Sequence, residues 1–532
     1  MSKRTRSRES SQETPAATKR AATTATLTTA MITGAAVMML ELLGTRVIGP
    51  FYGVSMFVWS SLISVTLISL AVGYFVGGRL ADRGRIDLSL ILVVAGLATA
   101  LIPVLRAPIL ALTNSLGLRA GAFCSALLLF FAPLTVLAMV GPYVVKTLAT
   151  QPEKVGSVSG AVMAVSTAGS VAGTLILGFF LLPMVGTRAI LYSIAAVLII
   201  LGIVLRLSFR SRAGGKPTPI ASLVLLALAA GLVAVADDGR TKMPEGYTLV
   251  YEAESTYGKI RVLDDESRGI RLMLSDASTI SAVRMGTTEG VFPYLSLLET
   301  LPHFNLQGRT ALVVGLGAGY LPMALEAHGV ATDGIEIDPV VAHAASEFFP
   351  FTQPRRLIVG DARYEVSRLA ERYDFIVHDC FTGGSVPAHV LSVEMLRDLR
   401  AHLNEGGVLA LNFFGFNRGS DASALEAVAA TLRSVFPHQR ILTTAPDRNP
   451  TDNIILASDR PLQHAQHDGP CSLSFDARNF LKRVDSLQVA LASNSGFVIT
   501  DDFNPLETLQ VPKAEAYREL VAKGLGLGVL VQ

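Results

Sequence analysis

The chain has 532 residues, of which half are apolar and 17% are charged, so its length allows several domains. Three cysteines exclude a disulfide-rich scaffold, and the high apolar content excludes a disordered or collagen-like chain. The net charge of +2 leaves no basic footprint over the whole chain, so nucleic acid is not expected as a partner.

Acidic residues and histidines divide the chain into two parts. Between residues 27 and 236 the acidic residues are Glu41, Asp82, Asp87 and Glu153, and the first histidine is His303. This distribution predicts a membrane part followed by a water-soluble part. It excludes a histidine-ligated metal site from the first part, and no metal is expected elsewhere.

The segment 1–26 is rich in Ser, Thr, Ala and basic residues and has no hydrophobic period, which predicts a disordered basic tail. Residues 27–236 then predict a transmembrane helical domain of about seven spans, since about 20 apolar residues cross a bilayer. The predicted spans are roughly 27–49, 57–78, 88–106, 120–141, 156–182, 188–206 and 219–236.

Basic residues predict the orientation of these spans. Alternate loops and the tail hold 15 Lys and Arg against 3 in the opposite loops, which places the N-terminus in the cytoplasm of a multi-pass membrane protein. Seven spans would then put residues 237–532 outside, whereas the nucleotide ligand inferred below favours the cytoplasm. The ligand therefore favours a cytoplasmic soluble part. In one alternative, residues 219–236 do not cross the bilayer and lie at the membrane–water interface.

The first predicted span contains Glu41 and Arg46. A carboxylate in hydrocarbon is costly, so these two residues are candidates for a function within the membrane. The alternative is an internal ion pair of Glu41 with Arg46 or Arg79 that fixes helix packing.

The soluble part predicts two units. Alternating apolar residues over 245–280 predict a small antiparallel β unit, which with a helix over 287–301 forms an entry domain at 237–303. Residues 304–532 predict an α/β doubly wound, Rossmann-like domain of the methyltransferase type that binds a nucleoside. Its expected strands are 310–315, 331–337, 356–360, 374–379, 407–413 and 453–458.

A glycine-rich loop follows the first of these strands. Gly315, Gly317 and Gly319 allow the backbone to approach a ligand closely at the start of a helix. Glu336 follows 21 residues after Gly315, where an acidic side chain accepts hydrogen bonds from ribose hydroxyls. Tyr320 stands where a dinucleotide fingerprint has its third glycine, which favours an adenosine ligand without a pyrophosphate.

Two more strand ends carry acids. Asp361 with Ala362 ends the third strand, where the carboxylate either accepts from an adenine amino group or caps a helix. Asp379 ends the fourth strand and is the candidate catalytic residue, because ligands bind beyond the carboxyl ends of parallel strands. Asp501 and Asp502 follow a later apolar strand and either complete the site or cap a turn.

These motifs, in this order and spacing, resemble the spermidine synthase, or polyamine aminopropyltransferase, family, and specifically its membrane-fused branch. The resemblance covers nearly the whole chain after residue 30. The segments that carry it are Gly315–Gly319, Glu336–Asp338, Gly360–Ala362, Asp379–Ala388, Tyr251–Gly258, Arg271–Asp276, Leu40–Pro50, Gly77–Arg83 and Thr500–Asp502.

The resemblance implies transfer of an aminopropyl group from decarboxylated S-adenosylmethionine to a polyamine such as putrescine. Asp379 would then orient the amine and take its proton, with Thr382, Asp501 and Asp502 near the substrate. No permanently bound cofactor is expected. The expected partners are a small amine and the lipid bilayer, and a homo-oligomer stays open.

The chain departs from the family at three positions. Ala318 stands where the family usually has an Asp in the glycine loop, Thr382 where it has a second Asp, and Gly258 where it has a Gln. These departures remove polar contacts to a cationic substrate. One alternative is therefore an S-adenosylmethionine-dependent methyltransferase on the same fold. Another is a membrane transporter or sensor whose nucleoside-binding domain is not catalytic and in which Glu41 is essential.

Overall fold

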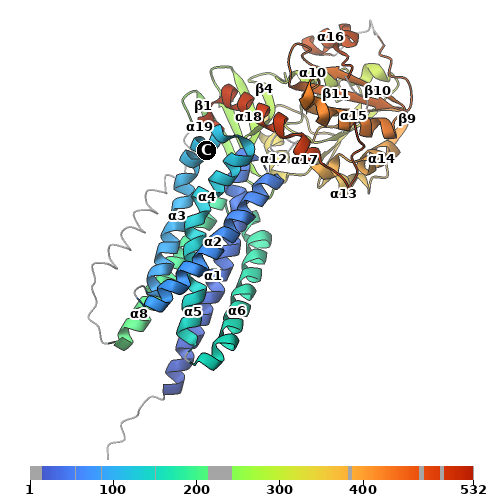
Figure 1. The fold of residues 1–532 in the computed structure, drawn as a ribbon. Coiled ribbons are helices and arrows are strands. Elements are labelled where there is room, and N and C mark those ends of the chain that lie inside the picture. Colours follow the sequence, from blue (N-terminus) through green and yellow to red (C-terminus); the bar gives the residue numbers. More distant parts are fainter. Residues whose placement is uncertain are drawn as a thin grey trace, which may run out of the picture. The chain divides into compact units, whose positions relative to one another are not determined.

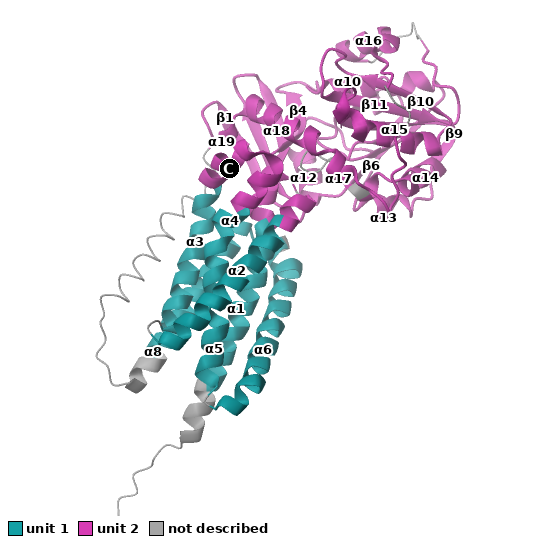
Figure 2. Ribbon diagram, in the orientation of Figure 1, with its two compact units in different colours: residues 1–44, 61–106, 126–239 teal, residues 45–60, 107–125, 240–532 magenta. Residues whose placement is uncertain are grey.

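The computed structural model describes residues 15–530, apart from residues 54, 85–86, 150, 214–242, 381–385, 466–472 and 492–495. The chain divides into two compact units (Figure 2). The first comprises residues 1–44, 61–106 and 126–239, and the second comprises residues 45–60, 107–125 and 240–532.

Long helices occupy residues 15–213 (Figure 1). Within the described residues, five stretches are long and apolar enough to cross a membrane, by length and composition only. The longest, 61 residues, contains two helices of span length, α3 and α4. The helices are α1 (Pro15–Tyr52), α2 (Met56–Arg83), α3 (Leu88–Thr113), α4 (Gly117–Ala138), α5 (Val140–Leu148), α6 (Val155–Ile176), α7 (Leu182–Met184) and α8 (Thr187–Ala213).

Helix α1 begins at Pro15, so the prediction of a disordered tail over 1–26 is wrong from residue 15 onward. Alanine has the highest helix propensity, and the alanine-rich segment that follows Pro15 extends the apolar helix towards the N-terminus. Residues 1–14 and the predicted span 219–236 lie outside the described residues.

Helix α6 packs closely on α1 inside the first unit. A Cβ atom on Gly169 would lie 2.0 Å from the carbonyl oxygen of Met31, so only glycine allows the two backbones to come this near. Ser170 Oγ donates to Gly34 O over 2.9 Å beside this contact. Small residues therefore hold these two helices together.

The second unit contains a four-stranded sheet with the order β1-β2-β3-β4, in which each strand is antiparallel to its neighbour. The helix expected over 287–301 is shorter than predicted: α10 spans Pro293–Leu298, and the short η4 spans Leu301–Phe304. Gly290 instead forms an isolated β-bridge with Val283, and Pro293 starts the helix. The strands are β1 (Tyr247–Glu254), β2 (Lys259–Asp265), β3 (Ile270–Ser275) and β4 (Ser278–Arg284).

A seven-stranded mixed sheet follows, in the order β10-β11-β9-β8-β5-β6-β7. Strands β5 to β9 run parallel, while β11 is antiparallel to both β9 and β10. The sequence prediction missed β10. The strands are β5 (Thr310–Val314), β6 (Ala331–Glu336), β7 (Arg356–Val359), β8 (Tyr373–His378), β9 (Leu403–Gly415), β10 (His438–Thr443) and β11 (Thr451–Ser458).

Both faces of this sheet are buried. Ala311 and Val313 of β5 join a core with the four-stranded sheet and α10–α12, whereas Leu312 and Val314 join a second core with α13–α15. The helices of this part are α11 (Tyr320–Ala327), α12 (Pro339–Phe348), α13 (Ala362–Val366), α14 (Val393–Ala401), α15 (Ser423–Val435), α16 (Phe475–Lys482), α17 (Leu506–Leu509), α18 (Val511–Leu525) and α19 (Leu527–Leu530).

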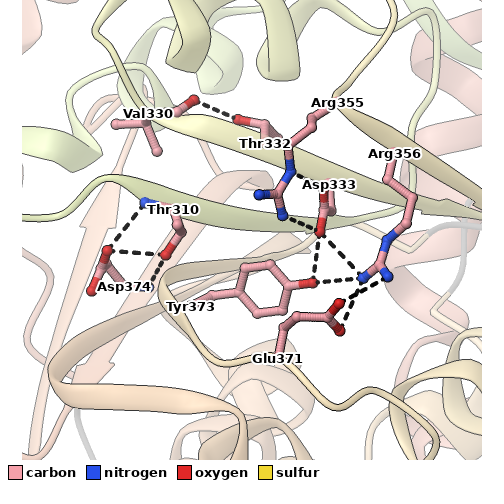
Figure 3. A network of polar contacts seen from close by, with 9 residues as sticks. All are labelled: Thr310, Val330, Thr332, Asp333, Arg355, Arg356, Glu371, Tyr373 and Asp374. Atoms are coloured by element: carbon pink, nitrogen blue, oxygen red, sulfur yellow. Dashed lines mark hydrogen bonds and ion pairs between the residues drawn. The ribbon is translucent and has the colours of Figure 1, made fainter.

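A polar network ties the strands together towards their amino ends (Figure 3). Asp333 on β6 has no exposed side-chain surface, and its carboxylate accepts from Arg355 over 2.7 Å and from Tyr373 Oη over 2.9 Å. Arg356 joins the same carboxylate to Glu371. The network fixes β6, β7 and β8 at the edge opposite to the strand ends that carry the candidate site.

Candidate active site

Strands β5 and β8 end side by side, and the chain leaves β5 through the glycine loop. Gly315 N donates to Ile335 O over 2.9 Å, and Asp379 N donates to Val314 O over 2.8 Å. Gly315 has a φ of 97°, and a Cβ atom there would lie 2.2 Å from the carbonyl oxygen of Asp379. Glycine at 315 is therefore what brings the loop against Asp379.

The four-stranded sheet contributes to the same loop. Ala318 N donates to Ser281 Oγ on β4 over 3.2 Å, and Gly317 and Gly319 also have positive φ values, 55° and 91°. Successive positive φ values keep the loop tight before α11 begins at Tyr320. The entry sheet thus helps to form the predicted nucleoside site.

Glu336 ends β6 and is buried under the glycine loop. Its Oε2 accepts from Leu316 N over 3.0 Å, and its Oε1 accepts from Asp338 N over 3.0 Å. Burial raises the pKa of Glu336 to about 7, although the backbone hydrogen bonds oppose this shift. Glu336 therefore holds the loop in place, and its predicted contact with ribose stays a prediction.

Asp338 and Asp361 both cap helices. Asp338 accepts from Val340 N over 2.8 Å with Pro339 in the first turn. Asp361 accepts from Tyr364 N over 3.0 Å ahead of the buried Ala362, and its second oxygen lies 3.0 Å from His389 Nε2. Burial opposes ionisation of Asp361, but these hydrogen bonds outweigh it and lower its pKa. Each Asp361 oxygen keeps a further lone pair that an adenine amino group can use, so the contact with adenine stays a prediction.

Asp379 lies among polar groups that come from distant parts of the chain. Asn412 Nδ2 on β9 donates to Asp379 Oδ1 over 2.9 Å, and the Tyr294 hydroxyl of α10 also hydrogen-bonds to the carboxylate. Asp379 keeps some accessible surface, yet the surrounding protein raises its pKa to about 6. A carboxylate that is accessible and titrates near neutral pH suits proton transfer.

A second acid, Asp452, lies close to Asp379, and Lys513 lies close to Asp452. Burial and the charge of Asp379 raise the pKa of Asp452, on β11, to about 7. Burial lowers the pKa of Lys513 to about 7, against the attraction of Asp452. Lys513 Nζ lies 5.1 Å from the centre of the Phe413 ring, and Tyr517, one turn further along α18, stacks edge-on against Phe414 at 5.5 Å. Helix α18 therefore borders the site.

Other predicted site residues lie elsewhere. Asp501 forms an ion pair with Arg363, and its backbone N donates to Glu394 over 3.0 Å. Asp502 is exposed. Among the described residues the structure brings neither of them to Asp379, and Thr382 lies outside that part of the chain.

The two candidates in the first predicted span belong to different units. Glu41 is half-buried within α1 in the first unit. Arg46 belongs to the second unit, where its guanidinium donates to the carbonyl oxygens of Ser255, over 3.2 Å, and Thr256. The Arg46 guanidinium thus binds backbone oxygens.

Sequence reasoning missed Tyr294, Asn412, Asp452, Lys513 and Tyr517. Two of them carried a signal, because Asn412 interrupts an apolar strand sequence at a buried position and Asp452 is an acid at the start of another apolar strand. Lys513 and Tyr517 carried none, since α18 was not predicted and its polar sequence reads as a surface helix.

Comparison with known proteins shows relatives of two kinds. No family model matches the chain. It is 33% identical over 226 residues to an N-terminal histidine N-methyltransferase of Emericella nidulans, covering 38% of this chain and 39% of that one. It is 32% identical over 209 residues to a polyamine aminopropyltransferase of Vibrio vulnificus, covering 36% and 65% respectively.

Among solved structures, a probable spermidine synthase from Corynebacterium glutamicum is 17% identical with a TM-score of 0.37, covering 46% of this chain and 96% of that one. The chain spans less than two thirds of the length of either curated relative above. Both of these relatives are named as transferases that act on nitrogen groups, one a methyltransferase and the other an aminopropyltransferase.

Proposed function

We propose that residues 240–532 transfer an alkyl group from the sulfonium of an S-adenosylmethionine-type donor to an amine nitrogen. The observation that carries this proposal is the position of Asp379. Its carboxylate is accessible, has its pKa raised to about 6, and follows β8 directly beside the glycine loop. Ligands of open parallel sheets bind at such neighbouring carboxyl ends.

The reaction needs a neutral amine held in line with the carbon on sulfur. The amine lone pair forms the new N–C bond while the C–S bond breaks. The electron pair of the C–S bond stays on sulfur, which leaves as a neutral thioether. The amine loses one proton, which Asp379 accepts. Tyr294 and Asn412 hold that carboxylate in position, and positioning of this kind supplies much of the rate.

Methyl is the transferred group that the site supports better. Ala318 supplies no carboxylate for the ammonium end of an aminopropyl donor, and its backbone N is occupied by Ser281. The similarity to a relative named as an N-terminal histidine N-methyltransferase supports the same choice.

Aminopropyl transfer from decarboxylated S-adenosylmethionine to a polyamine, as in spermidine biosynthesis, is the second candidate. Asp452 favours it, because a second carboxylate near Asp379 attracts a cationic amine. The similarity to the Vibrio vulnificus aminopropyltransferase supports it as well.

Donor titration of the purified full chain separates the two candidates. Isothermal calorimetry should give tighter binding of S-adenosylmethionine than of its decarboxylated form. Mass spectrometry of an amine product should show an added methyl group. Tighter binding of the decarboxylated donor together with an aminopropyl product would establish the second candidate, and binding of neither donor would refute both.

We also propose that the apolar helices anchor this enzyme in a lipid bilayer. The five apolar stretches within the described residues support this. After cell lysis the full chain should stay with membranes in alkaline carbonate and enter solution only in detergent. Release by carbonate alone would contradict the anchor.

A further inference from the structure

Two buried amide atoms beside the candidate site have no hydrogen-bond partner among the described residues. They are Asn412 Oδ1 and Gln510 Nε2, on side chains of residues that are only 2% and 1% exposed. A buried polar atom without a partner destabilises the folded protein, because the atom has lost its hydrogen bonds to water. Such atoms persist in binding sites where a ligand supplies the missing partner.

The hydrogen bonds that these amides do make fix which atom is free. Asn412 Nδ2 donates to Asp379, so its free atom is an acceptor. Gln510 Oε1 accepts from Val386 N over 3.2 Å and from Lys513 Nζ over 2.8 Å, so its free atom is a donor. The site therefore presents an unused acceptor next to Asp379 and an unused donor next to Lys513.

Lys513 determines which kind of ligand group suits the unused donor, Gln510 Nε2. It is 2% exposed, lies over the ring of Phe413 and interacts with Asp452. A lysine with an amide N–H beside it suits a carbonyl or carboxylate oxygen. The same lysine repels the second ammonium of a diamine, because like charges held close in a poorly solvated region are weakly screened.

We propose that the acceptor is an amine with a carbonyl or carboxylate oxygen on its adjacent carbon, as at the amino terminus of a peptide or in a free amino acid. The inference rests on the proposed function. The amine donates to Asn412 Oδ1 and Asp379, and the oxygen accepts from Gln510 Nε2 and faces Lys513. The amino terminus of a peptide has a pKa near 8, against about 10.4 for an alkylamine, so far more of it is neutral at pH 7.

The full-length chain in detergent, with methyl-labelled S-adenosylmethionine, tests this acceptor class. The probes are triglycine amide, its N-acetylated form, glycine and 1,4-diaminobutane. We expect label in triglycine amide or glycine, none in the acetylated peptide, and at least tenfold less in the diamine. Preference for the tripeptide indicates a peptide terminus, and preference for glycine indicates a free amino acid.

Substitutions test the two ends of the site separately. Gln510→Glu keeps the oxygen that binds Val386 and Lys513 and replaces only the free donor, so KM for the preferred acceptor should rise about tenfold with kcat little changed. Lys513→Met should raise transfer to 1,4-diaminobutane relative to the wild type. Lys523→Met is the matched control on the exposed last turn of α18 and should leave both measurements unchanged.

The failure of this inference differs from failure of the proposed function. If the donor binds but the diamine is labelled as well as triglycine amide and glycine, or none of the probes is labelled, the inference is overturned. An unchanged KM in Gln510→Glu also overturns it. If no donor binds to the folded chain, the proposed function fails first.

Discussion

Asn412 Nδ2 donates a hydrogen bond of 2.9 Å to Asp379 Oδ1, joining the end of β8 to β9 close to its carboxyl end. The two strands are parallel neighbours, and the paired positions His378 and Leu411 directly precede these two residues. Strand register alone therefore brings an amide to the candidate base. This bond stabilises the ionised carboxylate and opposes the rise in pKa that burial causes.

Replacing Asp379 tests whether it is the proton acceptor. Asp379→Asn removes the base and keeps the side-chain shape, so turnover should fall about 10²- to 10⁴-fold. Donor affinity measured by calorimetry should stay within about threefold, since the glycine loop and Glu336 are intact. Equal loss of affinity and turnover would identify Asp379 as a donor-binding residue instead.

Removing Asn412 should change the pH dependence of catalysis. Asn412→Leu deletes a hydrogen bond to the ionised form of Asp379, so the carboxyl pKa should rise above about 6 by about one unit. Because the base works when deprotonated, the acid limb of the kcat/KM profile should move to higher pH. A merely structural Asn412 would reduce activity at every pH and leave the limb in place.

Donor binding should depend on pH through Glu336. Its pKa of about 7 means that the carboxylate gains a proton as the pH falls through 7, and a neutral carboxyl accepts ribose hydrogen bonds less well. Donor affinity should therefore drop between pH 8 and pH 6. Glu336→Gln should lower affinity about tenfold and flatten this dependence, whereas Glu347→Gln on the exposed surface of α12 should do neither. A pH-independent affinity in the wild type would argue against a ribose contact.

Glycine at 315 should be essential for folding of the loop. Gly315→Ala combines a left-handed φ with a contact of 2.2 Å to Asp379 O, and these effects should cost about 2–5 kcal/mol in the free energy of unfolding. Gly329→Ala is the control, because its φ is 75° but no atom lies within 4 Å, so about 1–2 kcal/mol is expected. Equal losses in chemical denaturation would show that the contact with Asp379 relaxes freely.

The Asp333 network should contribute stability that disappears in acid. Burial opposes ionisation of Asp333, but Arg355 and Tyr373 outweigh it and lower its pKa below the usual 3.8. Its contribution is therefore present above pH 4 and is lost as the pH falls through the lowered pKa.

Asp333→Asn should lower the free energy of unfolding at pH 7 by about 1–3 kcal/mol without affecting donor affinity. Glu371→Gln, at the exposed end of the same network, should change it by less than Asp333→Asn does, because solvent screens this ion pair. Denaturant titrations of both variants check this difference, which would vanish if the buried position of Asp333 were unimportant.

The amino-acid sequence by itself determined the residues of the proposed donor site. Gly315, Glu336, Asp361 and Asp379 each end a strand whose apolar pattern is local, and parallel strands collect such ends at one edge. Six of the seven strands of the large sheet followed from the same pattern. Strand β10 did not, because its first three residues, His438, Gln439 and Arg440, are polar and break the apolar pattern.

Only the tertiary structure decided the acceptor side. Tyr294, Asn412, Asp452, Gln510 and Lys513 come from separate elements, and no spacing along the chain relates them. Their partnership arises because β9, β11 and α18 pack around the end of β8, and this burial shifts the pKa values of Asp452 and Lys513 towards 7. Desolvation and unpaired amides depend on what surrounds a residue, so a linear pattern does not reveal them.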